Sequence, residues 1–364
     1  MPTVEDILAL LRDIEVPDLG HDLVSLGMVQ DLKIMHGIVT FTVTIKPGAT
    51  ALQGRLDAPL KQAVRAIEGV NDVAIHWLVT PEKPATSARP AGKGAPPGGP
   101  AALPPGVKTV IAVGSGKGGV GKSTVTVNLA LALAATGARV GVLDADIYGP
   151  SVPYLLGVPE QKPTVRNDKL VPIEAFGLKV MSMGFLLPDP DEPVVWRGPM
   201  LAGAMRQFFQ DVDWGELDHL VVDLPPGTGD VPLSLVQLVP VNGAVIVLTP
   251  QPIAAAIGTK TLRMLEAAHT PILGVVENMS HFVCEHCGSE TDIFTRGGGR
   301  TVAEHAGVAL LGEIPLDPVI RASGDAGCPV VVAAPTSPQA VAFHQLARAV
   351  QERLLATAAS ATRP

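Results

Sequence analysis

The sequence predicts an α/β fold with a doubly wound, mostly parallel sheet, preceded by a small α+β domain. Three observations support this. Beyond residue 107, short apolar runs alternate with helical patterns, which is typical of a parallel sheet covered by helices. A glycine-rich loop joins the first of these runs to the first of these helices. The first 80 residues instead follow the order helix, strand, strand, helix, strand.

The elements of the small domain, expected over residues 1–80, follow from hydrophobic spacing. Apolar residues recur at helical intervals over residues 3–14. Val29–Met35 and Ile38–Ile45 read as a hairpin, Leu52–Ile67 as a helix and Val70–Val79 as the last strand. This order makes a compact domain of ordinary size.

Residues 81–106 are rich in proline, glycine and alanine, and Leu103 is their only large apolar side chain. Such a stretch cannot bury enough surface to offset the entropy of ordering, so we expect a flexible linker. The large domain is then expected over residues 107–357, with a disordered tail at 358–364.

The glycine-rich loop fits a phosphate-binding loop. Gly116, Gly121, Lys122 and Ser123 satisfy G-x-x-x-x-G-K-[ST], between a predicted strand at 107–113 and a helix that begins at about Ser123. Bare backbone N–H groups and the helix dipole favour an anion there. Lys122 can reach the β- and γ-phosphates of ATP, and the Ser123 hydroxyl can ligate Mg²⁺. Nucleotide contacts are expected along the whole loop: Gly116, Lys117, Gly118, Gly119, Val120, Gly121, Lys122, Ser123 and Thr124.

A second lysine in this loop, Lys117, is not needed by an ordinary P-loop. The run from Lys117 to Thr124 resembles the deviant Walker A loop of the MinD/ParA class of P-loop NTPases. The resemblance implies that this lysine reaches the nucleotide of a dimer partner, where a second cation offsets charge that develops during phosphoryl transfer. A solvated lysine on a loop tip is the alternative.

Carboxylates follow two further predicted strands. Asp223 ends the run 219–222, a Walker B pattern that places a carboxylate near the Mg²⁺ held by Ser123. Asp144 and Asp146 follow the strand at 139–143. The resemblance implies that Asp146 orients the attacking water and that Asp144 lies near Mg²⁺; a purely structural Asp144 is the alternative.

Two more buried strands are expected at 243–249 and 271–276, and a closing helix at 340–355. Asn278 follows the second of these strands and resembles the asparagine that recognises adenine in the same class. An amide both donates and accepts, which suits the edge of adenine. An Asx turn is the alternative for Asn278.

Cys284 and Cys287 form a C-x-x-C pair, and Cys328 is the only other cysteine. Two chains would supply four thiolates, enough for one [4Fe–4S] cluster at a two-fold axis. A shared zinc site, helped by His281 and His286, and a thiol–disulfide pair are alternatives. Cys328 reads as a small buried residue.

Composition narrows the class of protein. The formal net charge is −8, which does not favour a nucleic-acid-binding surface. No apolar run reaches the length of a membrane span, and the first residues lack the pattern of a signal peptide. A cytoplasmic protein without membrane contact is therefore expected.

Several motifs together resemble the Mrp/ApbC family of iron–sulfur carriers. They are the P-loop, Leu143–Ser151, Trp196–Met200, Asp223–Asp230, Glu277–Ser280 and the cysteine pair. The stretch Val24–Val29 resembles a PaaD-like domain, although residues 46–51 lack the cysteine that some members carry, so a docking module without chemistry is favoured.

The Mrp/ApbC resemblance implies a homodimer that binds ATP, hydrolyses it slowly, and holds a labile [4Fe–4S] cluster. It also implies that assembly scaffolds and apo-proteins are the partners, the latter receiving the cluster. A MinD/ParA-like positioning ATPase and a nucleotide-dependent metallochaperone for zinc or nickel are the competing hypotheses.

Overall fold

The structure is a computed structural model of the chain. The structure describes residues 2–12, 14, 16, 22–26, 28–35, 38–45, 50–67, 69–79, 103–147, 149–186, 198–238, 240–284 and 286–361. The chain divides into two compact units, Met1–Gly94 and Ala95–Pro364. Most of the expected linker, 81–106, lies outside the described residues, so its flexibility and the domain limits stay predictions.

The first unit has the predicted order of elements. These are α1 (Val4–Arg12), β1 (Val29–Met35), β2 (Ile38–Ile45), α2 (Thr50–Arg65) and β3 (Asp72–Val79). The sheet order is β1-β2-β3, with β1 antiparallel and β3 parallel to β2. Leu11 of α1, Leu60 of α2 and Phe41 of β2 belong to one cluster of buried apolar side chains. The small domain thus has its own hydrophobic core.

The second unit is built on an eight-stranded sheet, which is parallel except for its last strand. In spatial order the strands are β15 (Leu310–Ile314), β12 (Ile272–Asn278), β11 (Gly243–Leu248), β4 (Val107–Ser115), β10 (Leu217–Asp223), β5 (Val140–Asp144), β9 (Leu178–Ser182) and β8 (Ile173–Ala175). Only β8 pairs in antiparallel fashion. Later strands lie on both sides of β4, so the loop after β4 lies where doubly wound sheets bind ligands. The predicted fold class is confirmed.

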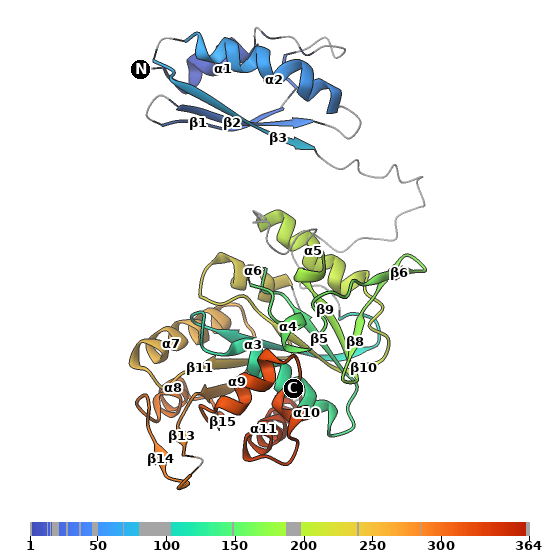
Figure 1. Cartoon of the computed structure of the whole chain (residues 1–364), viewed down its shortest axis with the longest axis vertical. Helices are drawn as coiled ribbons and strands as arrows, with labels where there is room; N and C mark the ends of the chain where they lie inside the picture. Colours follow the sequence, from blue (N-terminus) through green and yellow to red (C-terminus); the bar gives the residue numbers. More distant parts are fainter. Residues whose placement is uncertain are drawn as a thin grey trace. The chain divides into compact units, whose positions relative to one another are not determined.

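Helices cover both faces of this sheet (Figure 1). One layer contains α3 (Lys122–Ala134), α10 (Val330–Ala333) and α11 (Pro338–Ala361); the other contains α5 (Gly198–Gln210), α6 (Asp230–Leu238), α7 (Pro252–Ala267) and α8 (Gly298–Ala306). In β4, Ile111 and Val113 pack toward the first layer, and Val110 and Ala112 toward the second. Because both faces of the central strands are covered, β4, β5 and β11 are buried along most of their length.

Short elements complete the second unit: α4 (Val152–Leu155), β6 (Thr164–Arg166), β7 (Lys169–Val171), the 3₁₀ turn η1 (Met183–Leu186), β13 (Phe282–Val283), β14 (Glu290–Thr291) and α9 (Pro318–Asp325). The end of the chain differs from expectation. Helix α11 continues to Ala361, so residues 358–361 are helical and not part of a disordered tail. No helix within the described part of the chain is both long and apolar enough to cross a membrane.

Candidate nucleotide site and cysteine hairpin

The glycine-rich loop connects β4 to α3 at the carboxyl edge of the sheet. Gly119 and Gly121 both have φ of +78°, a left-handed conformation that favours glycine. A Cβ on Gly121 would also lie 2.3 Å from Asn278 Nδ2, whereas Cβ atoms on Gly118 and Gly119 would meet nothing within 4 Å. The loop therefore presents bare backbone to open space in front of the α3 N-terminus, which suits a phosphate group.

Lys122 and Ser123 meet the carboxylate of Asp223 at the base of this loop. Lys122 Nζ lies 2.7 Å from Asp223 Oδ2, and the Ser123 hydroxyl donates to the same oxygen over 2.6 Å. Thr126 donates to the other oxygen, Oδ1, over 2.7 Å. Asp223 is fully buried. One hydroxyl and one carboxylate thus face each other beside a lysine, a donor set of hard oxygens that fits Mg²⁺.

The two aspartates at the end of β5 differ in whether they line the cavity. Asp146 lines the cavity above the P-loop, and its Oδ2 is 3.7 Å from Lys122 Nζ. Asp144 is fully buried and is not among the lining residues. It accepts hydrogen bonds from the backbone N–H groups of Asp146 (3.1 Å) and Val152 (3.2 Å) and from the Ser182 hydroxyl (3.1 Å). These contacts suit a carboxyl group that fixes the backbone around Asp146; direct contact of Asp144 with a ligand stays a prediction.

Burial, and secondly the negative charge of Asp223, raises the pKa of Asp144 to about 8. The folded protein therefore keeps a proton that the unfolded chain, with its ordinary value of 3.8, releases at lower pH. The contribution of Asp144 to the free energy of unfolding is fully present below the unfolded pKa and is lost as pH rises toward 8.

We expect Asp144→Asn, which cannot ionise, to flatten the fall in melting temperature between about pH 5 and about pH 8 in the nucleotide-free protein. Calorimetry across this range checks the prediction. The control is Asp218→Asn: the pKa of half-buried Asp218 is lowered by its hydrogen bond to Lys108, so its ionisation lies below this window. If the melting temperature of Asp144→Asn fell with rising pH as steeply as that of the wild type, Asp144 would already be ionised at pH 5.

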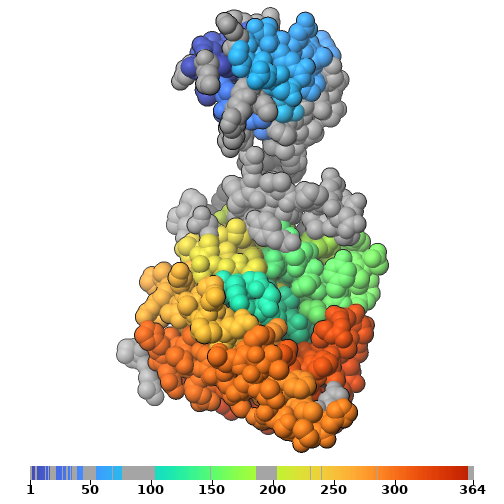
Figure 2. Space-filling model, turned by 60° about the vertical axis from the view of Figure 1, so that its left-hand side comes forward, coloured from blue at the N-terminus to red at the C-terminus, as the bar shows by residue number. Residues whose placement is uncertain are grey.

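Two cavities meet at the P-loop. The first, of about 300 Å³, is lined by the loop, Asp146 and Pro226; the second, of about 200 Å³, by Asn278, Leu316 and part of α9. They share Gly121, Thr124 and Leu155. In Figure 2, turquoise atoms, the colour of the residues around the P-loop, reach the surface between yellow and orange segments. The pair of cavities suits a phosphate chain joined to a base.

Lys117 lines the first cavity, and its Nζ donates to Gln251 Oε1 over 3.1 Å. Asn278 is buried, and its Nδ2 donates to the Val120 carbonyl over 2.8 Å. Asn278 also lines the second cavity. Both side chains thus contact protein groups next to the space that a nucleotide would fill.

The cysteine pair lies on the β13–β14 hairpin. Cys284 is half-buried and Cys287 is exposed. The backbone closes the turn, because Gly288 N–H donates to the Cys284 carbonyl over 2.8 Å and Cys284 N–H to the Ser289 carbonyl over 3.0 Å. The Ser289 hydroxyl lies 3.0 Å from Cys287 Sγ, and this bond, followed by the Ser289 backbone and Cys284, lowers the pKa of the Cys287 thiol. A thiol with a lowered pKa is a better metal ligand and nucleophile.

Nothing else in the described part of the chain completes a metal site around this pair. No group of three or more His, Cys, Asp or Glu side chains lies close enough to hold a metal ion among those residues. Cys328 is half-buried, not buried as the sequence suggested. A full ligand set at Cys284 and Cys287 therefore needs ligands from outside the described residues of one chain.

The structure brings together Lys122, Ser123, Asp146 and Asp223, with Lys117 on the same cavity and Asn278 on the next. Neither cysteine lines these cavities. Sequence reasoning missed Thr126, Gln251 and Glu277. A threonine in a buried helix gives no signal, but Gln251 and Glu277 are polar residues at the carboxyl ends of apolar strands, which is a usable signal.

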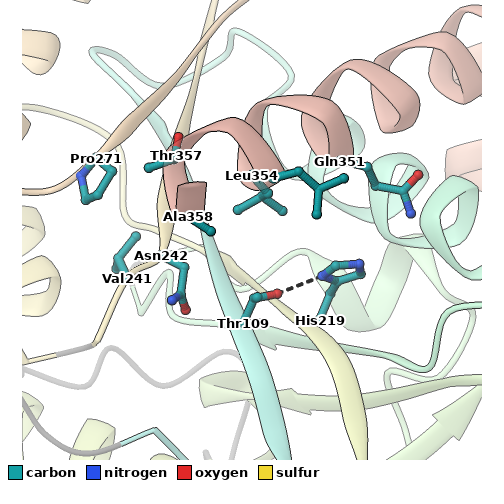
Figure 3. Close-up of a pocket in the computed structure, with 10 residues that line it drawn as sticks. Thr109, His219, Val241, Asn242, Pro271, Gln351, Leu354, Thr357 and Ala358 are labelled. Atoms are coloured by element: carbon teal, nitrogen blue, oxygen red, sulfur yellow. Dashed lines mark hydrogen bonds between the residues drawn. The ribbon is translucent and has the colours of Figure 1, made fainter. Parts of the chain in front are cut away.

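A larger cavity, of about 540 Å³, lies beneath α11, at the amino-terminal ends of β4 and β10. It contains none of the predicted site residues. Figure 3 shows Thr109 and His219, whose side chains are 2.7 Å apart, facing Leu354 and the last turns of α11. Its walls are mostly apolar, and no cluster of charged groups lies there.

Comparisons with known proteins agree with this geometry. The family model described as "NUBPL iron-transfer P-loop NTPase" matches residues 106–351, and the model "Iron-sulfur cluster assembly protein" matches residues 4–77. The iron-sulfur cluster carrier protein of Deinococcus radiodurans is 46% identical over 94% of this chain and 93% of its own length.

Two solved structures are similar to the large unit. A nucleotide-binding protein from Archaeoglobus fulgidus, in complex with ADP, is 43% identical, with a TM-score of 0.58 over 65% of this chain and 92% of that chain. The septum site-determining protein MinD from Pyrococcus horikoshii, complexed with Mg-ADP, is 26% identical, with a TM-score of 0.51 over 68% and 98% of the two chains.

The fold and the loop after β4 define a P-loop NTPase of the MinD/ParA type. Within that class, the chain belongs to the NUBPL iron-transfer P-loop NTPase family, with an N-terminal iron–sulfur cluster assembly domain.

Proposed function

We propose that this protein is a nucleotide-dependent iron–sulfur cluster carrier. It binds and slowly hydrolyses Mg-ATP at the P-loop, holds a labile [4Fe–4S] cluster between two copies of the chain, and transfers the cluster to apo-proteins in the cytoplasm. The observation that carries the proposal is the hairpin with Cys284 and Cys287, which offers two thiols and no third ligand among the described residues. The carrier name of the Deinococcus radiodurans relative supports it.

Two thiolates per chain explain both the dimer and the ease of transfer. A [4Fe–4S] cluster takes four cysteine ligands, so two copies complete one set. If the two hairpins face each other across a two-fold axis, both chains use the same surface and contribute the same two cysteines. The cluster is then lost when the two chains separate, which makes it transferable cargo.

The nucleotide site supplies the other half of the function. In the proposal Lys122 contacts the β- and γ-phosphates, and the P-loop backbone from Gly116 to Thr124 cradles the phosphate chain. Ser123 and Asp223 would hold Mg²⁺, which neutralises charge on the phosphate oxygens. Lys117 acts on the nucleotide of the partner, and Asn278 contacts the base.

Asp146 is proposed to orient the attacking water, since it borders the phosphate cavity. We expect Asp146→Ala to keep Mg-ATP binding but to hydrolyse it roughly 10²–10⁴-fold more slowly. Titration calorimetry and steady-state phosphate release check the two parts. Equal losses of binding and turnover would instead assign Asp146 to the metal.

The competing hypotheses are less well supported. The MinD structure is 26% identical to this chain, against 46% for the iron–sulfur carrier relative. A zinc or nickel metallochaperone would share the cysteine pair and differ in its cargo.

Anaerobic reconstitution with ferrous iron and sulfide tests the proposal. We expect about two irons and two acid-labile sulfides per chain, one cluster per dimer, and transfer to an apo-protein that needs a [4Fe–4S] cluster. Mössbauer spectroscopy identifies the cluster type. Stoichiometric zinc without acid-labile sulfide would favour the metallochaperone, and about four irons per chain would contradict a shared cluster.

A further inference from the structure

The two cysteines lie on a segment that leaves the sheet and returns close to where it left. This cysteine segment, residues 279–296, runs from the end of β12 to the start of α8. Glu277, on β12 just before the segment, is fully buried and accepts hydrogen bonds from two backbone groups just after it. These donors are Gly297 N–H, at 3.3 Å from Oε1, and Gly299 N–H, which bonds Oε2.

The sequence around this contact is adapted to it. Gly297 has φ of +86°, and a Cβ on Gly299 would lie 2.8 Å from the Cβ of Glu277. A buried carboxylate bonded to the first N–H groups of a helix is also stabilised by the helix dipole. Glu277 therefore fastens the two ends of the cysteine segment to each other.

The start of the segment also touches the P-loop. Asn278, next to Glu277, donates from Nδ2 to the Val120 carbonyl over 2.8 Å. Met279 follows with φ of +57°, unusual for a residue other than glycine. Ser280 is buried, and its N–H donates to the Ile314 carbonyl over 2.9 Å. The chain thus leaves β12 in one fixed direction, set by contacts that include the P-loop.

The end of the segment reaches the P-loop by a second route. The Thr295 hydroxyl donates to the Pro250 carbonyl over 2.9 Å, and a Cβ on Gly298 would lie 2.5 Å from the same oxygen. The next residue, Gln251, accepts from Lys117 Nζ over 3.1 Å. Both ends of the cysteine segment are therefore one or two contacts away from residues that border the phosphate cavity.

We propose that Glu277 is a positioning residue through which the state of the nucleotide site reaches Cys284 and Cys287. The inference rests on nucleotide binding at the P-loop, as proposed above. A phosphate, which for Lys117 belongs to the nucleotide of the partner, binds the Lys117 ammonium more strongly than the neutral amide of Gln251 does, and a base competes for the Asn278 amide. Nucleotide thus releases a P-loop contact at each end of the cysteine segment. Because Glu277 holds these ends together, they move as one unit and shift the hairpin between them.

Thiol alkylation of the cluster-free protein tests this coupling without any metal. The full-length chain is treated anaerobically with iodoacetamide, with and without Mg-ADP, which has a base and phosphates but no γ-phosphate to hydrolyse. The alkylation rates of Cys284 and Cys287 are followed by peptide mass spectrometry and divided by the alkylation rate of glutathione. Half-buried Cys284 is the more sensitive reporter. We expect Mg-ADP to raise its rate about fivefold in the wild type, within the usual range of coupling between two sites.

The test variant is Glu277→Gln, which keeps the shape of the side chain and removes its charge. We expect it to bind Mg-ADP, to react faster at Cys284 without nucleotide, and to respond to Mg-ADP less than about twofold. The matched control is Glu266→Gln, an exposed glutamate near the end of α7 that pairs with Arg263 over 2.8 Å; it should keep the wild-type response. Thr295→Val, on an exposed side chain, removes only the Pro250 contact and should weaken the response even if Glu277→Gln folds poorly.

Calorimetric titration of the same samples distinguishes a failure of the proposed function from a failure of the inference about Glu277. If Mg-ADP does not bind the wild type, both the proposed function and this inference are wrong. If Mg-ADP binds but leaves the Cys284 rate unchanged, or if Glu277→Gln and Thr295→Val respond like Glu266→Gln, only the positioning role of Glu277 is overturned.

Discussion

Lys122→Ala is expected to abolish ATP hydrolysis, lowering turnover by at least about 10³-fold. Lys122 Nζ lies 2.7 Å from Asp223 and 3.7 Å from Asp146, so it is a cation shared by two carboxylates. Its own side chain is 6% exposed. With nucleotide bound, the same ammonium is the group best placed to contact the β- and γ-phosphates. Steady-state phosphate release measures the loss.

The same substitution is expected to lower the free energy of unfolding of the nucleotide-free protein by about 3–5 kcal/mol, since it leaves the buried Asp223 carboxylate without its cation. Turnover is therefore measured at a temperature at which circular dichroism shows the variant folded. Lys108→Ala is the control, because exposed Lys108 pairs with Asp218 at the other end of β10. A Lys122→Ala variant with wild-type turnover would rule out the P-loop assignment.

Lys117→Ala distinguishes the deviant loop from an ordinary one. The substitution removes the side chain that donates to Gln251 and leaves the Lys122–Asp223 pair intact. Nucleotide binding should persist while turnover falls. If hydrolysis and cluster transfer were unchanged, Lys117 would be a solvated loop lysine.

Cys284→Ala and Cys287→Ala are expected to abolish cluster binding, with iron falling from about two per chain to background. Each chain offers only this pair on the hairpin, so one substitution removes two of the four thiolates in the proposed dimer. Mg-ATP binding should stay intact, because neither cysteine lines the nucleotide cavities. Iron, sulfide and nucleotide are measured on the same reconstituted samples.

Cys328→Ala is the matched control. This half-buried cysteine follows α9 and lies outside the hairpin, so its loss should leave the iron content unchanged. A Cys284→Ala variant that keeps its full iron would contradict the shared cluster. Loss of iron in Cys328→Ala would show that the ligand set includes a third cysteine.

Local sequence patterns were sufficient for much of the fold. The strand, glycine-rich loop and helix around Lys122 are contiguous, and their hydrogen bonds and dihedral preferences are local, so spacing predicted them. The short strands β8 and β15 at the edges of the sheet, and β9 beside β8, were not predicted. They are three to five residues long, too short for periodicity to distinguish them from loops.

Within the candidate site, the sequence by itself determined the residue types: a P-loop with two lysines, carboxylates at strand ends and a cysteine pair. Only the tertiary structure decided which of them meet. Thr126 and Asp223, 97 residues apart, share a hydrogen bond because β4 and β10 are neighbours in the sheet.

The tertiary structure likewise buried Asp144 behind the cavity and joined Glu277 to Gly299 across the cysteine segment. Sequence spacing fixes the face on which a side chain lies. The order of strands in a sheet depends instead on the packing of two helical layers, which involves the whole domain at once.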